Sequence, residues 1–330
     1  MPQNILEWGI ALILLLQSLG DWLIGPMNVF TFTGNTEFFL LIMPAVYWCW
    51  DSRLGLRVAV ILLLSLAVNL ALKVIWHDPR PYWLDTRVRL LTLPEVTFGI
   101  PSAHSQNSMM VWGMLAAHLQ KSLAWVAAAL IILITGLSRM YLGVHFPTDV
   151  VAGWILGIIM LILFLKFEEP VASRLKNLAE IAQIGLILAV SLFYIGLGAI
   201  VTNYVGLSFM VPPEWGQNHL VQAPDISIAP FSLENIIIVA GVFFGMVGGA
   251  ILFNARFTFD AGGPWLKRLE RFGLGVIGVL VLWQGLGALF DLLAADESLP
   301  GYLLRYIRFT LIGGWITALA PWVFLKMKLA

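Results

Sequence analysis

The sequence predicts an all-α fold, a polytopic bundle of membrane-spanning helices. Of its 330 residues, 60% are hydrophobic and only 12% are charged, whereas a soluble domain carries about 25% charged residues. Several runs approach the roughly 20 apolar residues that cross a bilayer. The formal net charge is zero, so no broad basic surface favours nucleic acid as a partner. The single cysteine, Cys49, excludes an internal disulfide and a cysteine-rich metal site.

Apolar runs along the chain are interpreted as ten membrane spans. The first run contains Glu7 and Gln17, and the fourth is short, so nine spans is the alternative count. In chain order, the runs lie near residues 5–23, 37–50, 55–76, 105–119, 122–137, 149–166, 178–201, 234–254, 272–293 and 306–325.

The basic residues are distributed unequally between the two sides of this arrangement. Strict alternation of ten spans assigns 12 of the 19 Lys and Arg residues to the side of the N-terminus and seven to the other. An excess of Lys and Arg marks the cytoplasmic side. We therefore predict that both termini are cytoplasmic. The longest loop of the opposite side, residues 202–233, contains no Lys or Arg and is predicted to face outward.

Three polar stretches fall at span ends that alternation places on the outer face. They are "KVIWHDPRP" at 73–81, "PSAHSQNS" at 101–108 and "SRMYLGVHFPTD" at 138–149. Lys73, Arg80 and Arg139 offer cationic and forked donors that suit a phosphate group. We expect these stretches to form one oxyanion site at the membrane surface.

The third stretch also contains the elements of nucleophilic catalysis. Asp149 follows His145 by four residues, so both lie on one face if a helix begins near His145. Asp149 can then accept the ring N–H and leave the other ring nitrogen as a nucleophile. Pro147 suits the first helical turn, whose N-terminus favours an anion. His104 is a second imidazole and can protonate a leaving oxygen.

Other polar residues near span ends are interpreted as structural. Basic residues at span ends commonly extend toward lipid headgroups, and isolated histidines are usually structural. The first interpretation applies to Arg87, Arg89, Arg305 and Arg308, the second to His77, His118 and His219, and Asp78, Asp85 and Glu95 are interpreted as solvated loop residues.

Taken in order, the three stretches resemble the motifs of the type 2 phosphatidic acid phosphatase superfamily. They match K-x(6)-R-P, P-S-G-H with one difference, and S-R-x(5)-H-x(3)-D. The resemblance covers roughly residues 5–166 and implies a six-span phosphatase core at 1–170. Residues 171–330 then form an additional transmembrane region, with about four spans and no known role.

The resemblance implies a role for each motif residue. His145 is expected to attack phosphorus and form a phosphohistidine, Asp149 to orient it, and His104 to act as general acid and base. The expected phosphate ligands are Lys73, Arg80, Ser102, Arg139 and the backbone near Ala103. No metal and no cofactor is expected. Ala103 stands where the family usually has glycine, which matters if that position needs positive φ.

We therefore expect an integral membrane phosphatase that hydrolyses a lipid phosphate monoester or diphosphate. Its active site is predicted on the extracytoplasmic face of the plasma membrane, where the substrate's tail can stay in the bilayer. A water-soluble sugar phosphate is the alternative substrate, and a transporter is less favoured because the ionisable groups lie at span ends. For residues 202–233, a lid, a dimer contact and a scaffold all remain open, as does a homo-oligomer.

Overall fold

The computed structural model describes residues 2–330, except for the side chains of residues 36, 37, 39 and 40. Its regular elements are all helical, and no strand occurs among the described residues, which confirms the predicted fold class. The first half of the chain forms α1 (Gln3–Gln17), α2 (Ile24–Phe32), α3 (Thr36–Cys49), α4 (Ser52–Trp76), α5 (Pro81–Leu84), α6 (Ala103–Leu119), α7 (Ser122–Tyr141) and α8 (Pro147–Lys176). The second half forms α9 (Glu180–Ser208), α10 (Pro213–Gln222), α11 (Glu234–Asn254), α12 (Trp265–Leu280), α13 (Leu286–Asp291), α14 (Leu299–Gly314) and α15 (Ala320–Lys326).

Fewer helices are long enough to cross a membrane than the ten predicted. In the described part of the chain, seven helices have sufficient length and apolar character, or eight if the bent pair of α1 with residues 21–32 counts as one. Two of the predicted spans are short helices, since α3 has 14 residues and α6 has 17. A straight crossing of the hydrocarbon core needs about 20 residues.

The predicted first span, residues 5–23, is not a straight helix. The chain turns by 89° between α1 and residues 21–32, at Gly20, which has a φ of +107°. The Gln17 side chain donates to the carbonyl of Tyr141 at 2.9 Å, and the Tyr141 hydroxyl donates to the carbonyl of Gly20 at 2.8 Å. A Cβ at Gly9 would lie only 2.7 Å from the Phe146 ring.

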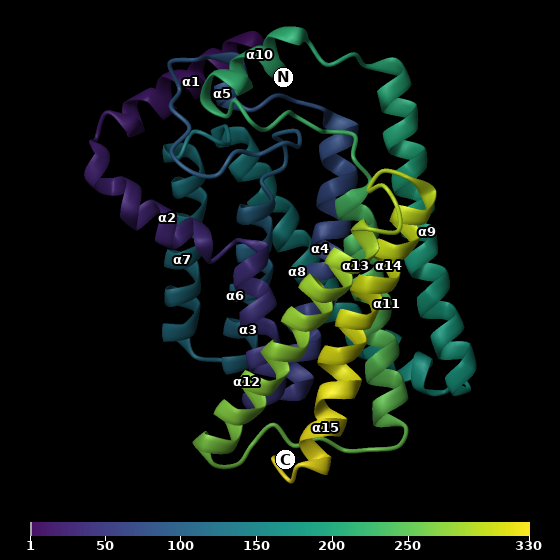
Figure 1. Ribbon diagram of the computed structural model, residues 1–330. Coiled ribbons are helices and arrows are strands. Elements are labelled where there is room, and N and C mark those ends of the chain that lie inside the picture. Colours follow the sequence, from purple (N-terminus) through teal and green to yellow (C-terminus); the bar gives the residue numbers. More distant parts are fainter. Residues whose placement is uncertain (1) are drawn as a thin grey trace. The chain divides into compact units, whose positions relative to one another are not determined.

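These contacts place α1 across the end of α7 and the start of α8 (Figure 1). The N-terminal helix therefore lies at the same end of this part of the molecule as His145. The prediction that the N-terminus lies on the side opposite to the motifs is wrong. Its basis was the assumption that each apolar run crosses the membrane, and a polar bend can return such a run to the side it came from.

Contacts divide the chain into two compact units. The first unit contains residues 1–38, 68–163 and 200–232, and the second contains residues 39–67, 164–199 and 233–330. All three motifs belong to the first unit. Residues 200–232, which follow the predicted division after residue 170, belong to it as well.

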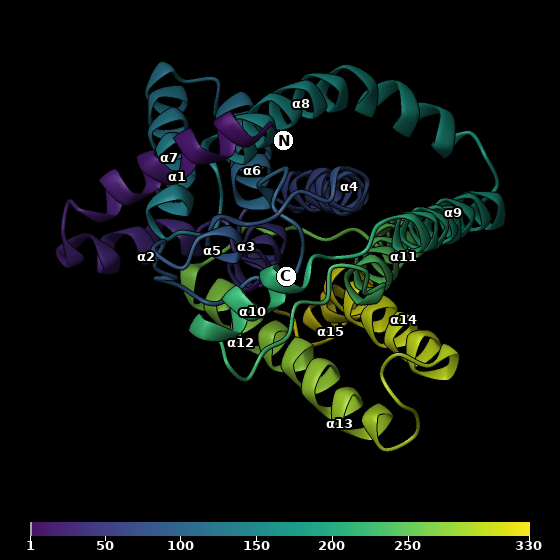
Figure 2. The ribbon, with the colours of Figure 1, turned by 90° about the horizontal axis from the view of Figure 1, so that it is seen from above.

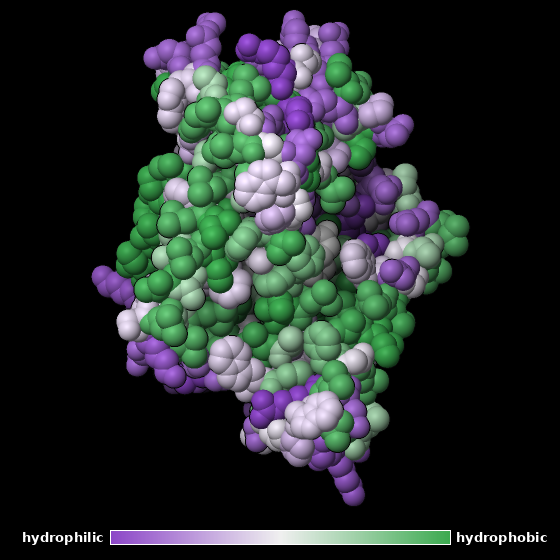
Figure 3. Space-filling model, turned by 90° about the vertical axis from the view of Figure 1, so that its left-hand side faces the viewer, coloured by the Kyte–Doolittle hydropathy of each residue, from purple (hydrophilic) through white to green (hydrophobic). Residues whose placement is uncertain are grey.

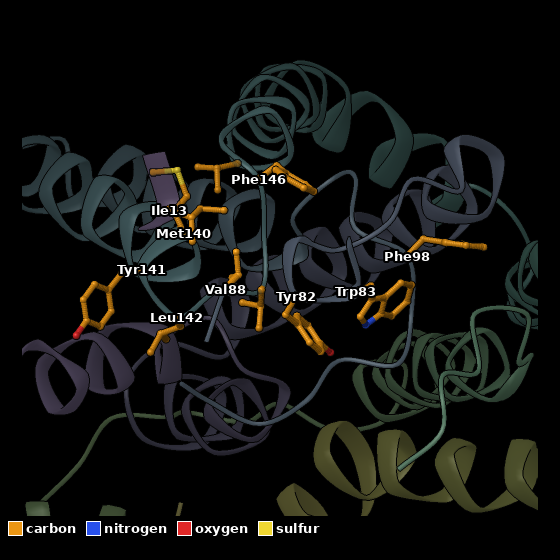
Figure 4. Packing of buried hydrophobic residues seen from close by; sticks show 11 residues of the cluster. Ile13, Tyr82, Trp83, Val88, Phe98, Met140, Tyr141, Leu142 and Phe146 are labelled. Carbon is orange, nitrogen blue, oxygen red and sulfur yellow. The ribbon is translucent and has the colours of Figure 1, made fainter. Parts of the chain in front are cut away.

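The first unit has its hydrophobic core next to the motifs. Within it, α6 packs against α7, and α2 also contacts α7 (Figures 1 and 2). The face formed by α2 and α7 is broadly hydrophobic (Figure 3), as expected for a surface that meets lipid tails. The buried cluster in Figure 4 comprises Ile13, Tyr82, Trp83, Val88, Phe98, Met140, Tyr141, Leu142, Val144, Phe146 and Val150.

In the second unit, glycines allow α11 and α14 to pack closely. Gly241, Gly245 and Gly249 recur every four residues, so they share one face of α11. A Cβ at Gly245 would lie 2.0 Å from the carbonyl oxygen of Thr310, and one at Gly241 would lie 2.8 Å from that of Tyr306. Such small-residue faces bring membrane helices into backbone contact.

Candidate active site

The first unit brings the three motifs together from five separate helix ends. Lys73 lies in the last turn of α4, and Arg80 immediately precedes α5. The second motif forms the start of α6, and Arg139 lies in the last turn of α7. His145 and Asp149 flank Pro147, the first residue of α8. Residues far apart in the sequence therefore meet in one place.

His145 is held between an acceptor and a donor. Its Nδ1–H donates to Asp149 Oδ2 at 3.1 Å, and an Arg80 Nη1–H points toward its Nε2 at 3.3 Å. A guanidinium can only donate, so Nε2 carries the lone pair. The side chains of His145 and Asp149 are 1% and 0% exposed. This arrangement selects the tautomer in which Nε2 is unprotonated and can act as a nucleophile.

The surroundings of His145 also keep its imidazole neutral. Burial lowers the pKa of His145 well below its ordinary value, and the nearby charge of Arg80 lowers it further. A neutral ring retains the lone pair on Nε2 at neutral pH. Nucleophilic attack requires this protonation state.

Arg80 is fully buried and is fixed by backbone carbonyls around the site. Its Nε–H donates to the carbonyl of Thr97 at 2.6 Å, and Nη1 donates to that of Val144 at 3.0 Å. Nη2 donates to the carbonyl of Phe98 at 3.1 Å, and Lys73 Nζ donates to the same carbonyl at 2.6 Å. The two cations of the first motif therefore meet at residues 97–99, and Arg80 is rigidly aimed at His145.

Arg139 approaches the same place from α7. Its Nη1 donates to Thr31 Oγ1 at 2.6 Å, and its Nη2 forms an ion pair with Glu95 Oε1. Its Nε–H is buried and has no partner among the described residues. A buried guanidinium donor of this kind usually has an acceptor. Arg139 therefore has a free donor for an anionic ligand.

Glu95 connects the two arginines, and its interpretation as a solvated loop residue is wrong. Its second oxygen, Oε2, accepts from Arg80 Nη2 at 3.3 Å, and its side chain is only 28% exposed. Burial by itself raises the pKa of Glu95, but Arg80 and Arg139 outweigh this effect and hold the pKa well below its usual range. The carboxylate is therefore ionised. The sequence interpretation failed because it considered neighbours along the chain, whereas both partners of Glu95 are distant in sequence.

The second motif forms the N-terminus of α6. The Ser102 Oγ accepts from the Ser105 N–H at 3.4 Å and caps this helix, while the Ser102 N–H donates to the carbonyl of Asp149 at 2.9 Å. Ala103 is the first helical residue and is not among the residues with positive φ. The methyl group that replaces the usual glycine therefore costs no backbone strain here. Free N–H groups at such a helix start favour an anion.

Three residues that the sequence analysis did not select complete the site. They lie in the last turn of α2 and in the connection to α3: Thr31 accepts from Arg139, and Asn35 Oδ1 is 2.7 Å from His104 Nε2. A Cβ at Gly34 would lie 2.8 Å from the His104 ring, so glycine allows the ring to approach. The polar stretch "TGNTE" at 33–37, between two apolar runs, was the available signal.

The segment 202–233 packs against the loops that carry the site. Trp83 Nε1–H donates to His219 Nδ1 at 3.0 Å, and the Asn218 amide donates to the carbonyl of Trp83 at 2.9 Å. Beyond α10, the Ala229 N–H donates to the carbonyl of Val96 at 3.0 Å, next to Glu95. His219 is fully buried, consistent with its structural interpretation. Of the three possibilities left open for this segment, these contacts favour the scaffold.

Within the described residues, no group of three or more His, Cys, Asp or Glu side chains is placed to hold a metal ion. The site is instead built from cations, imidazoles and backbone N–H groups. Such groups can bind an anion through hydrogen bonds and charge.

Comparison with known proteins finds two matching family profiles. The profile of the PAP2 superfamily matches residues 54–171, and the profile described as "PAP2 superfamily phosphatase, transmembrane extension" matches residues 237–330. The chain belongs to the PAP2 superfamily. Together with the apolar helices, the transmembrane extension identifies it as an integral membrane protein.

Individual relatives match different shares of the chain. Phosphatidylglycerophosphatase B of Bacillus subtilis is 36% identical over an alignment of 101 residues. The match covers 27% of this chain and 49% of that protein, so it spans about half of the relative's length. Bovine glucose-6-phosphatase 3 is 26% identical over 97% of this chain and 95% of that protein. The crystal structure of a transmembrane PAP2 type phosphatidylglycerolphosphate phosphatase from Bacillus subtilis covers 51% of this chain and 88% of that chain, with 28% identity and a TM-score of 0.43.

Proposed function

We propose that this protein is a membrane phosphatase that hydrolyses a lipid phosphate monoester or diphosphate through a phosphohistidine at His145. One observation carries the proposal: His145 donates through Nδ1 to Asp149, while its Nε2 lone pair faces the buried guanidinium of Arg80. A phosphoryl group bound by that guanidinium lies directly beside the nucleophile. Placing reactants at about 3–3.5 Å accounts for a large part of enzymatic rate enhancement.

The proposed reaction has two steps. In the first, the Nε2 lone pair of His145 forms a bond to phosphorus, and the bond from phosphorus to the leaving oxygen breaks. His104, in its protonated form, gives the leaving oxygen a proton. In the second, His104 takes a proton from water as the water oxygen attacks phosphorus, and the P–N bond breaks to release inorganic phosphate. Asp149 stabilises the charge on the His145 ring, and Arg80, Arg139 and Lys73 stabilise the phosphoryl oxygens.

A lipid substrate is favoured because the site lies at the ends of apolar helices in the first unit. A lipid tail can remain in the bilayer while its headgroup enters. Two relatives with lipid phosphates in their names, phosphatidylglycerophosphatase B and lipid phosphate phosphatase delta of Arabidopsis thaliana, match about half of their own lengths. A water-soluble sugar phosphate is the second candidate, and the match to glucose-6-phosphatase 3 over 97% of this chain favours it.

The test is phosphate release by detergent-purified protein from phosphatidic acid, a prenyl diphosphate, a sphingoid phosphate and glucose 6-phosphate. We expect turnover of a lipid substrate in EDTA, inhibition by vanadate, and acid-labile labelling of the protein by a ³²P substrate. His145→Ala should abolish turnover and labelling. His118→Ala, at the other end of α6 from His104, is the matched control and should leave both unchanged. Full activity of His145→Ala would overturn the mechanism, and turnover of glucose 6-phosphate alone would select the second candidate.

A further inference from the structure

Glu95 is an acidic side chain that the proposed mechanism does not use, although it lies among the phosphate ligands. Its Oε1 is paired with Arg139 and its Oε2 with Arg80, at 3.3 Å in the second case. A carboxylate that bridges two guanidiniums makes the same charge-assisted contacts as two oxygens of a phosphate. A carboxylate of the protein itself therefore occupies the space between the two guanidiniums.

Most N–H donors of Arg80 are already bound, which leaves few positions at which this guanidinium can bind a phosphoryl group. Its Nε–H and one Nη1–H are bound to the carbonyls of Thr97 and Val144, and Nη2 also reaches the carbonyl of Phe98. Two donors do not bind backbone carbonyls. One is directed at His145 Nε2, and the other, on Nη2, is shared by Glu95 Oε2 at 3.3 Å and Thr97 Oγ1 at 3.2 Å. A phosphoryl group close enough to His145 Nε2 to be attacked therefore contacts the edge of the Arg80 guanidinium that Glu95 also contacts.

The side chain of Glu95 can leave without disturbing the loop that carries it. The buried hydroxyl of Tyr82 accepts from the Glu95 N–H at 3.0 Å and donates to the Glu95 carbonyl at 2.9 Å, so the backbone is held on both sides. Glu95 lies outside the helices, between α5 and α6, and 28% of its side chain is exposed. Rotation about its side-chain bonds can therefore carry the carboxylate toward solvent while the backbone stays in place.

We propose that Glu95 is a resident anion, which occupies the phosphoryl position between Arg80 and Arg139 in the free protein and leaves it when substrate binds. This inference rests on the proposed phosphatase function. A phosphoryl dianion has more charge than a carboxylate and can use the free Nε–H of Arg139 as well, so it displaces Glu95. Return of Glu95 competes with inorganic phosphate, the product. Only a ligand with enough negative charge displaces Glu95, and the return of Glu95 promotes release of the product.

Because Glu95 competes for this position, it lowers the affinity of the protein for phosphate and vanadate. A ligand that binds only when Glu95 is displaced has an apparent affinity reduced by the fraction of molecules in that state. In Glu95→Gln, the neutral amide competes less, so vanadate and phosphate should bind about tenfold more tightly. Turnover should fall at the same time, because slower release of phosphate becomes limiting. A residue that only aligned the two arginines would give weaker binding when replaced.

The experiment measures vanadate affinity from the rise in melting temperature of purified protein, and phosphate affinity from product inhibition. Wild type, Glu95→Gln and the control Glu214→Gln are compared; Glu214 is exposed in α10 and belongs to the same unit. We expect tighter binding of both anions in Glu95→Gln only. Equal or weaker binding by a folded Glu95→Gln would overturn the inference and make Glu95 a purely positioning residue.

Glu95→Asp covers the case in which the glutamine variant does not fold. Its carboxylate keeps the charge but is shorter by one methylene, so it cannot bridge both guanidiniums, and vanadate should bind several-fold more tightly than to wild type. Unchanged or weaker binding in this variant would also overturn the inference. If wild-type protein itself binds neither vanadate nor phosphate, the proposed function fails, and the inference fails with it.

Discussion

At the scale of single residues, Asp149 combines two roles. Its Oδ2 accepts from His145 Nδ1 at 3.1 Å and from the Phe146 N–H at 3.0 Å. The first contact orients the His145 ring, and the second satisfies a backbone N–H just before α8. Arg139 forms its ion pair with Glu95.

The two roles of Asp149 can be separated by Asp149→Asn. The asparagine oxygen can still accept from the Phe146 N–H, so the melting temperature should change little; complete loss of a cap costs about 1 kcal/mol. Turnover should fall by roughly 10²–10⁴, because the amide cannot stabilise a charged imidazole and favours the wrong tautomer. The corresponding change in the Ser-His-Asp triad of serine proteases costs about 10⁴ in rate.

The measurement is a single-turnover rate together with a melting temperature on the same purified variant. Asp225→Asn, in an exposed part of the 202–233 segment, is the control. Lower thermal stability with an unchanged rate would mean that Asp149 only caps α8. His145 would then need a different orienting group.

At the scale of elements, α10 supports the segment that follows Arg80. The Gln222 amide donates to the carbonyl of Val88 at 2.8 Å, and its Oε1 accepts from the Leu90 N–H. Together with the bond between Trp83 and His219, these contacts fix α5 and the chain after it. Residues that lie outside the matched PAP2 region, 54–171, therefore help to hold the site.

Gln222→Ala should loosen this support without removing any group of the proposed chemistry. Two backbone groups lose their partner, at about 1 kcal/mol for each hydrogen bond. We expect a lower melting temperature and a several-fold higher KM, because Arg80 is held less firmly, with kcat changed less. Gln217→Ala, on an exposed position of the same helix, should behave as wild type. A Gln222→Ala protein with wild-type KM would show that α10 does not position the phosphate ligands.

At the scale of the whole molecule, the orientation of the site across the membrane remains a prediction. It rests on the distribution of basic residues, which the correction at α1 does not alter, since the first basic residue is Arg53. The correction does change the predicted side of the N-terminus, because α1 packs beside Phe146 at the end of the first unit that carries the site.

Single cysteines in a Cys49→Ala background test this orientation with an impermeant thiol reagent on intact cells. Gln3→Cys and Asp225→Cys should both react from outside, and Asn177→Cys, in the connection between α8 and α9, should react only after lysis. All three positions are exposed. Labelling of Asn177→Cys alone would mean that the site faces the cytoplasm, and different labelling of Gln3→Cys and Asp225→Cys would contradict the position of α1.

The fold class, the family and the motif residues could all be predicted from the sequence. Helical hydrophobic runs reflect the need to satisfy every backbone group within a segment in lipid, which is a local property of the chain. The pairing of His145 with Asp149 is also local, because four residues span one helical turn. Lys73, Arg80 and Arg139 could be selected because cations are uncommon in such an apolar chain.

The residues that complete the site and the placement of the first run became evident only in the folded chain. The partners of Glu95 lie 15 and 44 residues away in sequence, and that of Thr31 lies 108 residues away. An acidic or hydroxyl side chain in a loop has no periodicity that would reveal such a contact. The placement of the first run likewise depends on contacts with Tyr141 and Phe146, which are distant in sequence. Hydropathy measures how apolar a segment is and does not indicate where it turns.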